Sequence, residues 1–120
     1  MAQDFERAIA FDANNDINIG ASAVTVFTSN SDDAIISIRL ANIHTAQITV
    51  DVFIETAAAG GSDLNCYLIK GAPIPVGSSL ELIDSGSKIV LQNGDALKVQ
   101  SSTDNSLNCW VSFVDTISEG

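Results

Sequence analysis

The side chains of this sequence that could carry chemistry do not form a recognisable catalytic set. His44 is the only histidine, and acid–base catalysis would require a partner within hydrogen-bond distance of it. It follows the apolar run 34–43, so a surface loop is its expected place. The adjacent carboxylates Asp32 and Asp33 would point to opposite faces of a strand, and the chain has no G-x-S-x-G nucleophile motif. We therefore expect no catalytic residues and no enzymatic activity.

The candidate metal and phosphate ligands are equally incomplete. Asp12, Asn14 and Asp16 have the spacing that opens a calcium-binding loop. Ile17 stands where such loops need glycine, however, and no glutamate closes the loop. Two cysteines and one histidine are too few for a four-ligand zinc site. The glycine-rich segment 71–79 lacks the lysine and the following helix of a phosphate-binding loop. We expect neither a metal nor another cofactor.

The two cysteines lie in strand-like runs. Cys66 alternates in step with Leu64 and Leu68, and Cys109 alternates in step with Leu107 and other apolar residues, which turns both thiols towards apolar faces. Two buried free thiols are therefore predicted. A Cys66–Cys109 disulfide is the alternative, and an oxidising compartment would favour it.

Three aromatic side chains are candidates for binding. Phe53 is the outward-facing exception in the run 47–56, whose inward positions are isoleucine and valine. Trp110 is out of phase with Cys109 and therefore faces away from the core. With Tyr67, these rings could form an aromatic platform for a sugar, but a subunit interface that covers the tryptophan explains the pattern equally well. The predicted interface residues are Phe5, Phe11, Phe53 and Trp110.

Short apolar runs closed by turn residues must position these side chains, and none of the runs is long enough for a helix. Between Cys66 and Ser102 four runs are separated by turns about every 8–12 residues, as in a β-sandwich or small barrel. We expect the run 66–70 to end at Gly71. The segment with Pro73 and Pro75 then bridges strands or lies along a sheet edge, because proline cannot donate a ladder hydrogen bond.

Further strands are predicted at 22–28, 47–56 and 107–114. The most apolar run, 34–43, has apolar residues on both faces, which predicts a central strand or one covered by a second subunit. Its predicted faces carry Ile36, Ile38 and Leu40 on one side and Ile35 and Ala41 on the other.

Together these eight or nine strands predict an all-β fold. We expect one antiparallel β-sandwich of about eight strands over residues 1–120, either immunoglobulin-like or jelly-roll. A length of 120 residues suits a single domain. Residues 1–11 are expected to be a short strand or an N-terminal arm that packs on a neighbour.

The charge of the chain limits its partners. Fifteen acidic residues against five basic ones give a net charge of −10. Such a surface repels phosphate backbones and anionic membranes, so we expect neither nucleic acid nor a membrane as a partner. No apolar run approaches the roughly 18–20 residues of a membrane span, and the N-terminus does not resemble a secretory signal.

Three segments resemble a known family: AQITVDVFI (46–54), YLIKGAPIPVGSSLELI (67–83) and GSKIVLQNGDALKVQSS (86–102). They are similar to small virion structural proteins of tailed bacteriophages, particularly phages of marine cyanobacteria. The segment 67–83 is the most specific, and the first twenty residues do not carry the resemblance. It implies an all-β accessory protein of the phage particle, assembled in the host cytoplasm and without enzymatic activity.

Our leading hypothesis is a capsid decoration or cement protein on the head exterior that stabilises capsomer contacts. It would be a homo-oligomer, expected as a homotrimer, bound to the major capsid protein or another virion protein. A neck or tail-fibre component is the alternative within the same class. A carbohydrate-binding module for adsorption is a third hypothesis, and it requires Trp110 to be exposed on a shallow groove.

Overall fold

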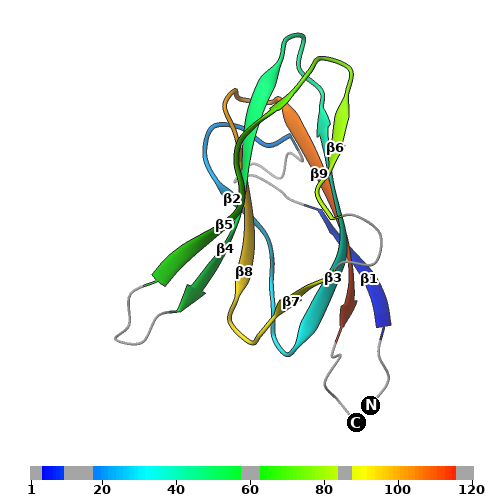
Figure 1. Ribbon diagram of the computed structural model, residues 1–120, viewed down its shortest axis with the longest axis vertical. Coiled ribbons are helices and arrows are strands. Elements are labelled where there is room, and N and C mark those ends of the chain that lie inside the picture. The colour runs from blue at the N-terminus through cyan, green and yellow to red at the C-terminus, as the bar shows by residue number, and fades with distance from the viewer. Residues whose placement is uncertain (1–3, 10–17, 58–62, 84–87, 116–120) are drawn as a thin grey trace.

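A computed structural model describes residues 4–9, 18–57, 63–83 and 88–115, which form nine β-strands in two packed antiparallel sheets (Figure 1). This confirms the predicted all-β sandwich. Over these residues, no helix is long and apolar enough to cross a membrane.

The two sheets are formed by different parts of the chain. Sheet A contains β1 (Asp4–Ile9), β9 (Leu107–Asp115), β3 (Asp33–Asn42) and, both on the far edge of β3, β6 (Ser79–Glu81) and β7 (Ile89–Leu91). Sheet B contains β2 (Val24–Thr28), β8 (Ala96–Ser101), β4 (Ile48–Ala57) and β5 (Asp63–Ile74), in this order. Residues 4–9 are thus a strand of the sandwich, which is the first of the two options considered for them.

The strand pairing is nested. β1 pairs with β9, β2 with β8, β3 with both β6 and β7, and β4 with β5. The chain therefore behaves as one long hairpin wound into two sheets, which is the jelly-roll arrangement. In an immunoglobulin fold the first two strands share a sheet, whereas β1 and β2 lie in different sheets here. The strand order selects the jelly roll.

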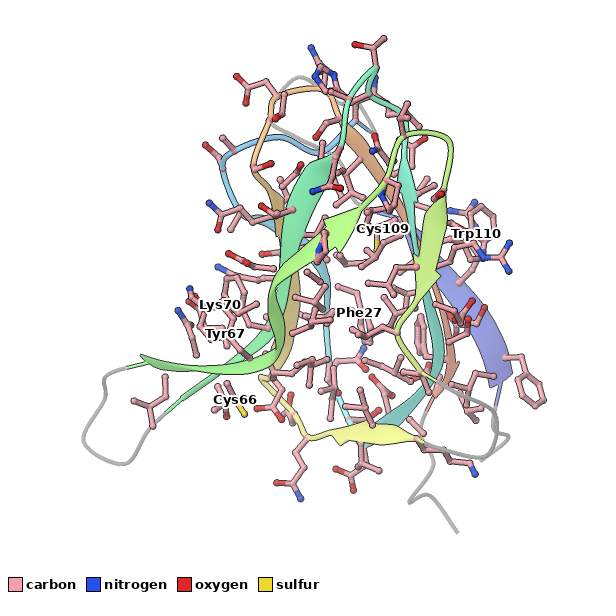
Figure 2. The ribbon with its side chains drawn as sticks, turned by 45° about the horizontal axis from the view of Figure 1, so that its top comes forward. Phe27, Cys66, Tyr67, Lys70, Cys109 and Trp110 are labelled. Atoms are coloured by element: carbon pink, nitrogen blue, oxygen red, sulfur yellow. The ribbon has the colours of Figure 1, made fainter. Side chains whose placement is uncertain are left out.

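Aliphatic side chains from both sheets fill the space between them. Sheet A contributes Ile38, Leu40 and Val111, and sheet B contributes Val52 and Leu97, all without exposed surface. One aromatic pair joins the sheets, because the ring of Phe27 on β2 stacks on that of Phe113 on β9 with centroids 4.5 Å apart. Figure 2 shows Phe27 among the side chains between the sheets.

A β-bulge in β3 changes which of its residues enter the core. The pairing with β9 shifts between Ile35 and Ser37. As a result Ile35 and Ile38 are fully buried, whereas Ile36 is only half-buried. The prediction that Ile36 shares a face with Ile38 was wrong. A prediction from strict alternation does not take into account the extra residue that a bulge inserts.

The edge strand β5 continues past the expected stop at Gly71. Gly71 has a φ of 67°, and the ladder with β4 is irregular beside it. Its N–H donates to Asp51 Oδ1 at 2.7 Å, and the pairing resumes with Ala72 opposite Val50. The prediction that the run ends at Gly71 was therefore wrong, since a positive-φ glycine can form a bulge as well as a turn. The edge position expected from the prolines was right.

Candidate interaction surface

A row of four side chains crosses the outer face of sheet A. Strand register places Ile9 beside Trp110, Trp110 beside Arg39, and Arg39 beside Glu81. Cys109 and Val111, on either side of the tryptophan in the sequence, are buried, whereas Trp110 itself is 51% exposed. The row therefore faces away from the core, as predicted for Trp110 from its phase in the strand.

Both arginines of the sequence lie on this face. The Arg7 guanidinium carbon is 5.4 Å from the centroid of the Trp110 ring, within the range of a cation–π contact. Arg39 Nε lies 3.5 Å from Glu81 Oε1, and the Ser37 hydroxyl donates to Glu81 Oε2 at 2.7 Å. In a chain with a net charge of −10, both arginines thus lie on one face, Arg7 over the Trp110 ring and Arg39 paired with Glu81.

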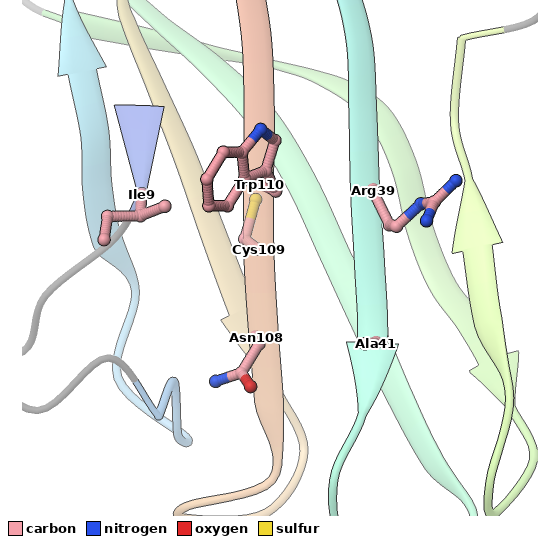
Figure 3. Close-up of a pocket in the computed structure, with 6 residues that line it drawn as sticks. All are labelled: Ile9, Arg39, Ala41, Asn108, Cys109 and Trp110. Atoms are coloured by element: carbon pink, nitrogen blue, oxygen red, sulfur yellow. The ribbon is translucent and has the colours of Figure 1, made fainter. Parts of the chain in front are cut away.

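A hollow of about 190 Å³ lies beside the tryptophan. In Figure 3 the Arg39 guanidinium group is directed away from Trp110, so mainly its aliphatic stem borders the hollow. The surface available inside is therefore mostly apolar, with the Asn108 amide at its rim. The lining residues are Ile9, Arg39, Ala41, Asn108, Cys109 and Trp110. Such a hollow suits an apolar side chain or the apolar face of a ring.

The other predicted interface residues differ in exposure and in position. Phe5 is 81% exposed and lies on the same outer face of sheet A. Phe53 is only 5% exposed, so the prediction of an exposed ring was wrong. Its centroid lies 5.0 Å from that of Tyr67 on the neighbouring strand, which covers it. Phe11 lies outside the described residues.

The three aromatic rings do not form one platform. Phe53 and Tyr67 are on sheet B, whereas Trp110 is on sheet A. Tyr67 has a separate cationic neighbour, since Lys70 Nζ lies 4.3 Å from its ring centroid. The predicted platform of all three was wrong, because sequence alternation shows that a residue points outwards but not from which sheet.

Both cysteines are free. Cys109 is buried as predicted, and desolvation by burial raises the pKa of its thiol to about 12. Cys66 is exposed, contrary to the prediction. It pairs with Ile54 near the end of the β4–β5 hairpin, and Figure 1 shows this end projecting beyond sheet A. Ile54 itself is buried, so the phase of the alternation alone did not predict the exposure of the thiol.

Of the remaining polar candidates, His44 and Asp33 lie in or beside loops. His44 lies in the turn after β3, where its backbone N–H donates to Asn42 Oδ1 at 2.7 Å. Asp33 is buried and accepts hydrogen bonds from the Ser29 and Ser31 hydroxyls at 2.9 and 3.1 Å. Asp12, Asn14 and Asp16 lie outside the described residues. Within the described ranges, no three His, Cys, Asp or Glu side chains gather as metal ligands.

The sequence interpretation missed three members of this face. Ile9 and Arg7 alternate with Phe5 and so share its side of the strand, and Arg39 interrupts an otherwise apolar run. The signal was present in that alternation. That these three residues share one face with Trp110 follows only from the register that aligns β1, β9 and β3.

Of the comparisons with known proteins, only the search of solved structures found a match. No protein-family model matches the chain, and no curated protein matches its sequence. One chain in the structure of infectious bursal disease virus, Gx strain, superposes with a TM-score of 0.50 over 99% of this chain, at 10% sequence identity. The shared property is the fold. This chain spans about a third of that chain, 32% of its length.

Proposed function

We propose that this protein is a structural component of a virus particle, and specifically a decoration protein on the head exterior of a tailed phage. Three observations support the proposal. The fold is a jelly roll, and a solved chain of similar fold comes from a virus structure. Residues 46–102 resemble phage virion proteins. The candidate site is a contact surface of tryptophan and arginine, the residue types that dominate protein–protein contacts.

The exposed Trp110 between two arginines carries this proposal. When a partner covers a half-exposed tryptophan beside an apolar hollow, the buried ring contributes a large share of the binding free energy. On a particle surface, many copies of one weak contact add through avidity. The partners are then further copies of this chain and the major capsid protein or another virion protein. The acidic remainder of the surface repels nucleic acid.

Particle imaging tests the position. Purified particles that contain this protein are imaged, and its copy number is measured against the major capsid protein by quantitative mass spectrometry. Copies in the hundreds, spread over the head, support decoration. Copies in the tens or fewer, at one vertex or along the tail, would instead support the neck or tail-fibre alternative. Absence from purified particles would refute both.

A binding assay links the particle to the candidate face. Particles stripped of the protein are incubated with wild-type protein or with Trp110→Ala. We expect the variant to bind at least about tenfold more weakly, because tryptophan contacts are commonly worth more than about 1–2 kcal/mol. Leu64→Ser is the matched control, since Leu64 is 57% exposed but belongs to sheet B. Equal binding of both variants would contradict this use of the face.

Carbohydrate binding is the second candidate, and one observation favours it: Trp110 is exposed beside a hollow. A pyranose can stack its apolar face on an indole ring while its hydroxyls reach Asn108. Because Trp110 is the only tryptophan, quenching of its emission by a panel of glycans reports on this site alone. Saturable quenching would support an adsorption module. Quenching that does not saturate would remove this candidate.

A further inference from the structure

An exposed phenylalanine and the Trp110 hollow lie on the same face of sheet A. Register places Phe5 beside Val114, Arg7 beside Ser112, and Ile9 beside Trp110. Since Val111 and Phe113 point into the core, the alternate residues Phe5, Arg7 and Ile9 point outwards. Phe5 and Ile9 are four residues apart, so the phenyl ring stands about 13 Å along the strand from the hollow.

The ring and the hollow are complementary in size and polarity. Among the described residues, Phe5 has the most exposed large apolar side chain, at 81%. The hollow has a volume of about 190 Å³ and mostly apolar walls. An apolar cavity of about 150 Å³ accommodates benzene, so the space suits a phenyl group. Within one chain the strand itself holds the two apart, so a ring that fills the hollow must come from another molecule.

We propose that two copies of this chain associate through sheet A, with Phe5 of each copy in the Trp110 hollow of the other. A two-fold axis that lies between the two facing sheets, runs across the strands and passes midway between ring and hollow satisfies both contacts at once, as in an isologous dimer. This inference goes beyond the proposed function, because the pair forms in solution without any particle. It differs from the trimer expected from the sequence, which remains a separate prediction.

The available area suits such a pair. β9 has nine residues, about 30 Å of strand, and four adjacent strands span about 19 Å. A contact across this face covers roughly 600 Å² per copy, or about 1,200 Å² in total, which is the lower limit for specific complexes. We therefore expect a reversible dimer whose fraction increases with protein concentration.

The full chain is tested by light scattering and tryptophan emission from low to high micromolar concentration. We expect the molar mass to rise from that of one chain to that of two. The emission of Trp110, the only tryptophan, should shift to shorter wavelength over the same range as the ring becomes covered. A constant monomer mass would overturn the proposal. A discrete trimer would overturn it too, because the reciprocal contact closes with two copies.

Variants locate the contact. Phe5→Ser removes the ring and Trp110→Ala removes a wall of the hollow, and each should raise the dimer dissociation constant at least about tenfold. Leu64→Ser, on sheet B, should leave the constant unchanged. Urea unfolding checks that Phe5→Ser keeps its stability, as expected for a residue that is 81% exposed.

The outcomes separate this inference from the proposed function. A dimer that persists in both Phe5→Ser and Trp110→Ala would place the contact elsewhere and overturn the proposal. Neither that result nor a monomer would affect the copy number on particles. Absence from particles, conversely, would leave a dimer sensitive to both substitutions intact.

Discussion

Trp110 and Cys109 are adjacent in the chain and have opposite environments. In a strand, successive side chains point to opposite faces, so Cys109 is 5% exposed in the core and Trp110 is 51% exposed. The same rule fails for Cys66, which is exposed although Ile54, its partner across the ladder, is buried. Burial of a single residue thus depends both on its phase and on what lies across from it.

Thiol labelling should distinguish the two cysteines. Native protein treated with a thiol reagent at neutral pH should react rapidly at Cys66, which is exposed, and not at Cys109, which is buried. Thiolate is the reactive form, and burial raises the pKa of the Cys109 thiol to about 12. We expect one fast equivalent in native protein and two in denaturant. Two fast equivalents in native protein would contradict the buried position.

The Cys109 thiol should also make stability depend on pH in the alkaline range. Its ordinary pKa is 9.0 and its pKa in the folded protein is about 12. Between these values the unfolded chain has lost the proton that the folded chain keeps, so the free energy of unfolding falls as pH rises. One such group contributes about 1.4 kcal/mol per pH unit, or on the order of 4 kcal/mol across the window.

Urea unfolding at several pH values from about 8 to 12 measures this contribution. Cys109→Ala is the control, since it lacks the thiol and should lose stability less steeply above pH 9. Equal slopes for wild type and variant would show that the thiol is not buried. Below pH 9 the thiol is protonated in both states, and the stability conferred by its shifted pKa is fully present.

Irregularities within strands decide which residues those strands bury. The bulge in β3 exchanges Ile36 for Ile35 in the core, and the irregular ladder beside Gly71 lets β5 continue along β4. In both strands the chain keeps hydrogen bonding on each side of the irregular residue. A strand boundary or face inferred from alternation alone is therefore correct only between bulges.

Alanine substitutions in β3 test the bulge. Ile35→Ala and Ile38→Ala should each reduce the free energy of unfolding by about 2–5 kcal/mol, the usual cost for a fully buried isoleucine. Ile36→Ala should cost less than about 2 kcal/mol, because its side chain is only half-buried. Urea denaturation measures all three. If Ile36→Ala lowered the free energy of unfolding as much as Ile38→Ala, the result would contradict the bulge and support uninterrupted alternation.

Substitution of Gly71 tests the second irregularity. A Cβ atom at this position would meet no atom within 4 Å, but the φ of 67° is unfavourable for alanine. Gly71→Ala should therefore cost about 1–2 kcal/mol from backbone strain alone. Gly71→Asn should cost less, because asparagine tolerates this conformation better. Equal stability of Gly71→Ala and wild type, measured by chemical denaturation, would exclude the positive φ.

The nested strand order brings the first and last strands together. β1 and β9 come from opposite ends of the chain and are hydrogen-bonded neighbours. That pairing creates the face on which Phe5, Arg7 and Trp110 lie. Contacts between distant segments incur the entropy of loop closure before they stabilise the fold.

Folding of the domain should consequently be slow for its size. We expect refolding from urea over milliseconds to seconds or longer, as in other all-β domains dominated by long-range pairing. Stopped-flow emission of Trp110 should follow it, since β9 needs both β1 and β3 as neighbours. Complete refolding within microseconds would imply that local contacts dominate.

Alternation, turn residues and charge were sufficient to predict most strands, the antiparallel sandwich and the outward position of Trp110. These features are local: the period of a strand and the conformational limits of glycine and proline act over a few residues. The choice between jelly roll and immunoglobulin fold, the cover of Tyr67 over Phe53 and the exposure of Cys66 depended on which strands became neighbours. So did the placement of both arginines on the face that carries Trp110. These were decided only in three dimensions, because register and sheet membership arise from contacts between segments far apart in the chain.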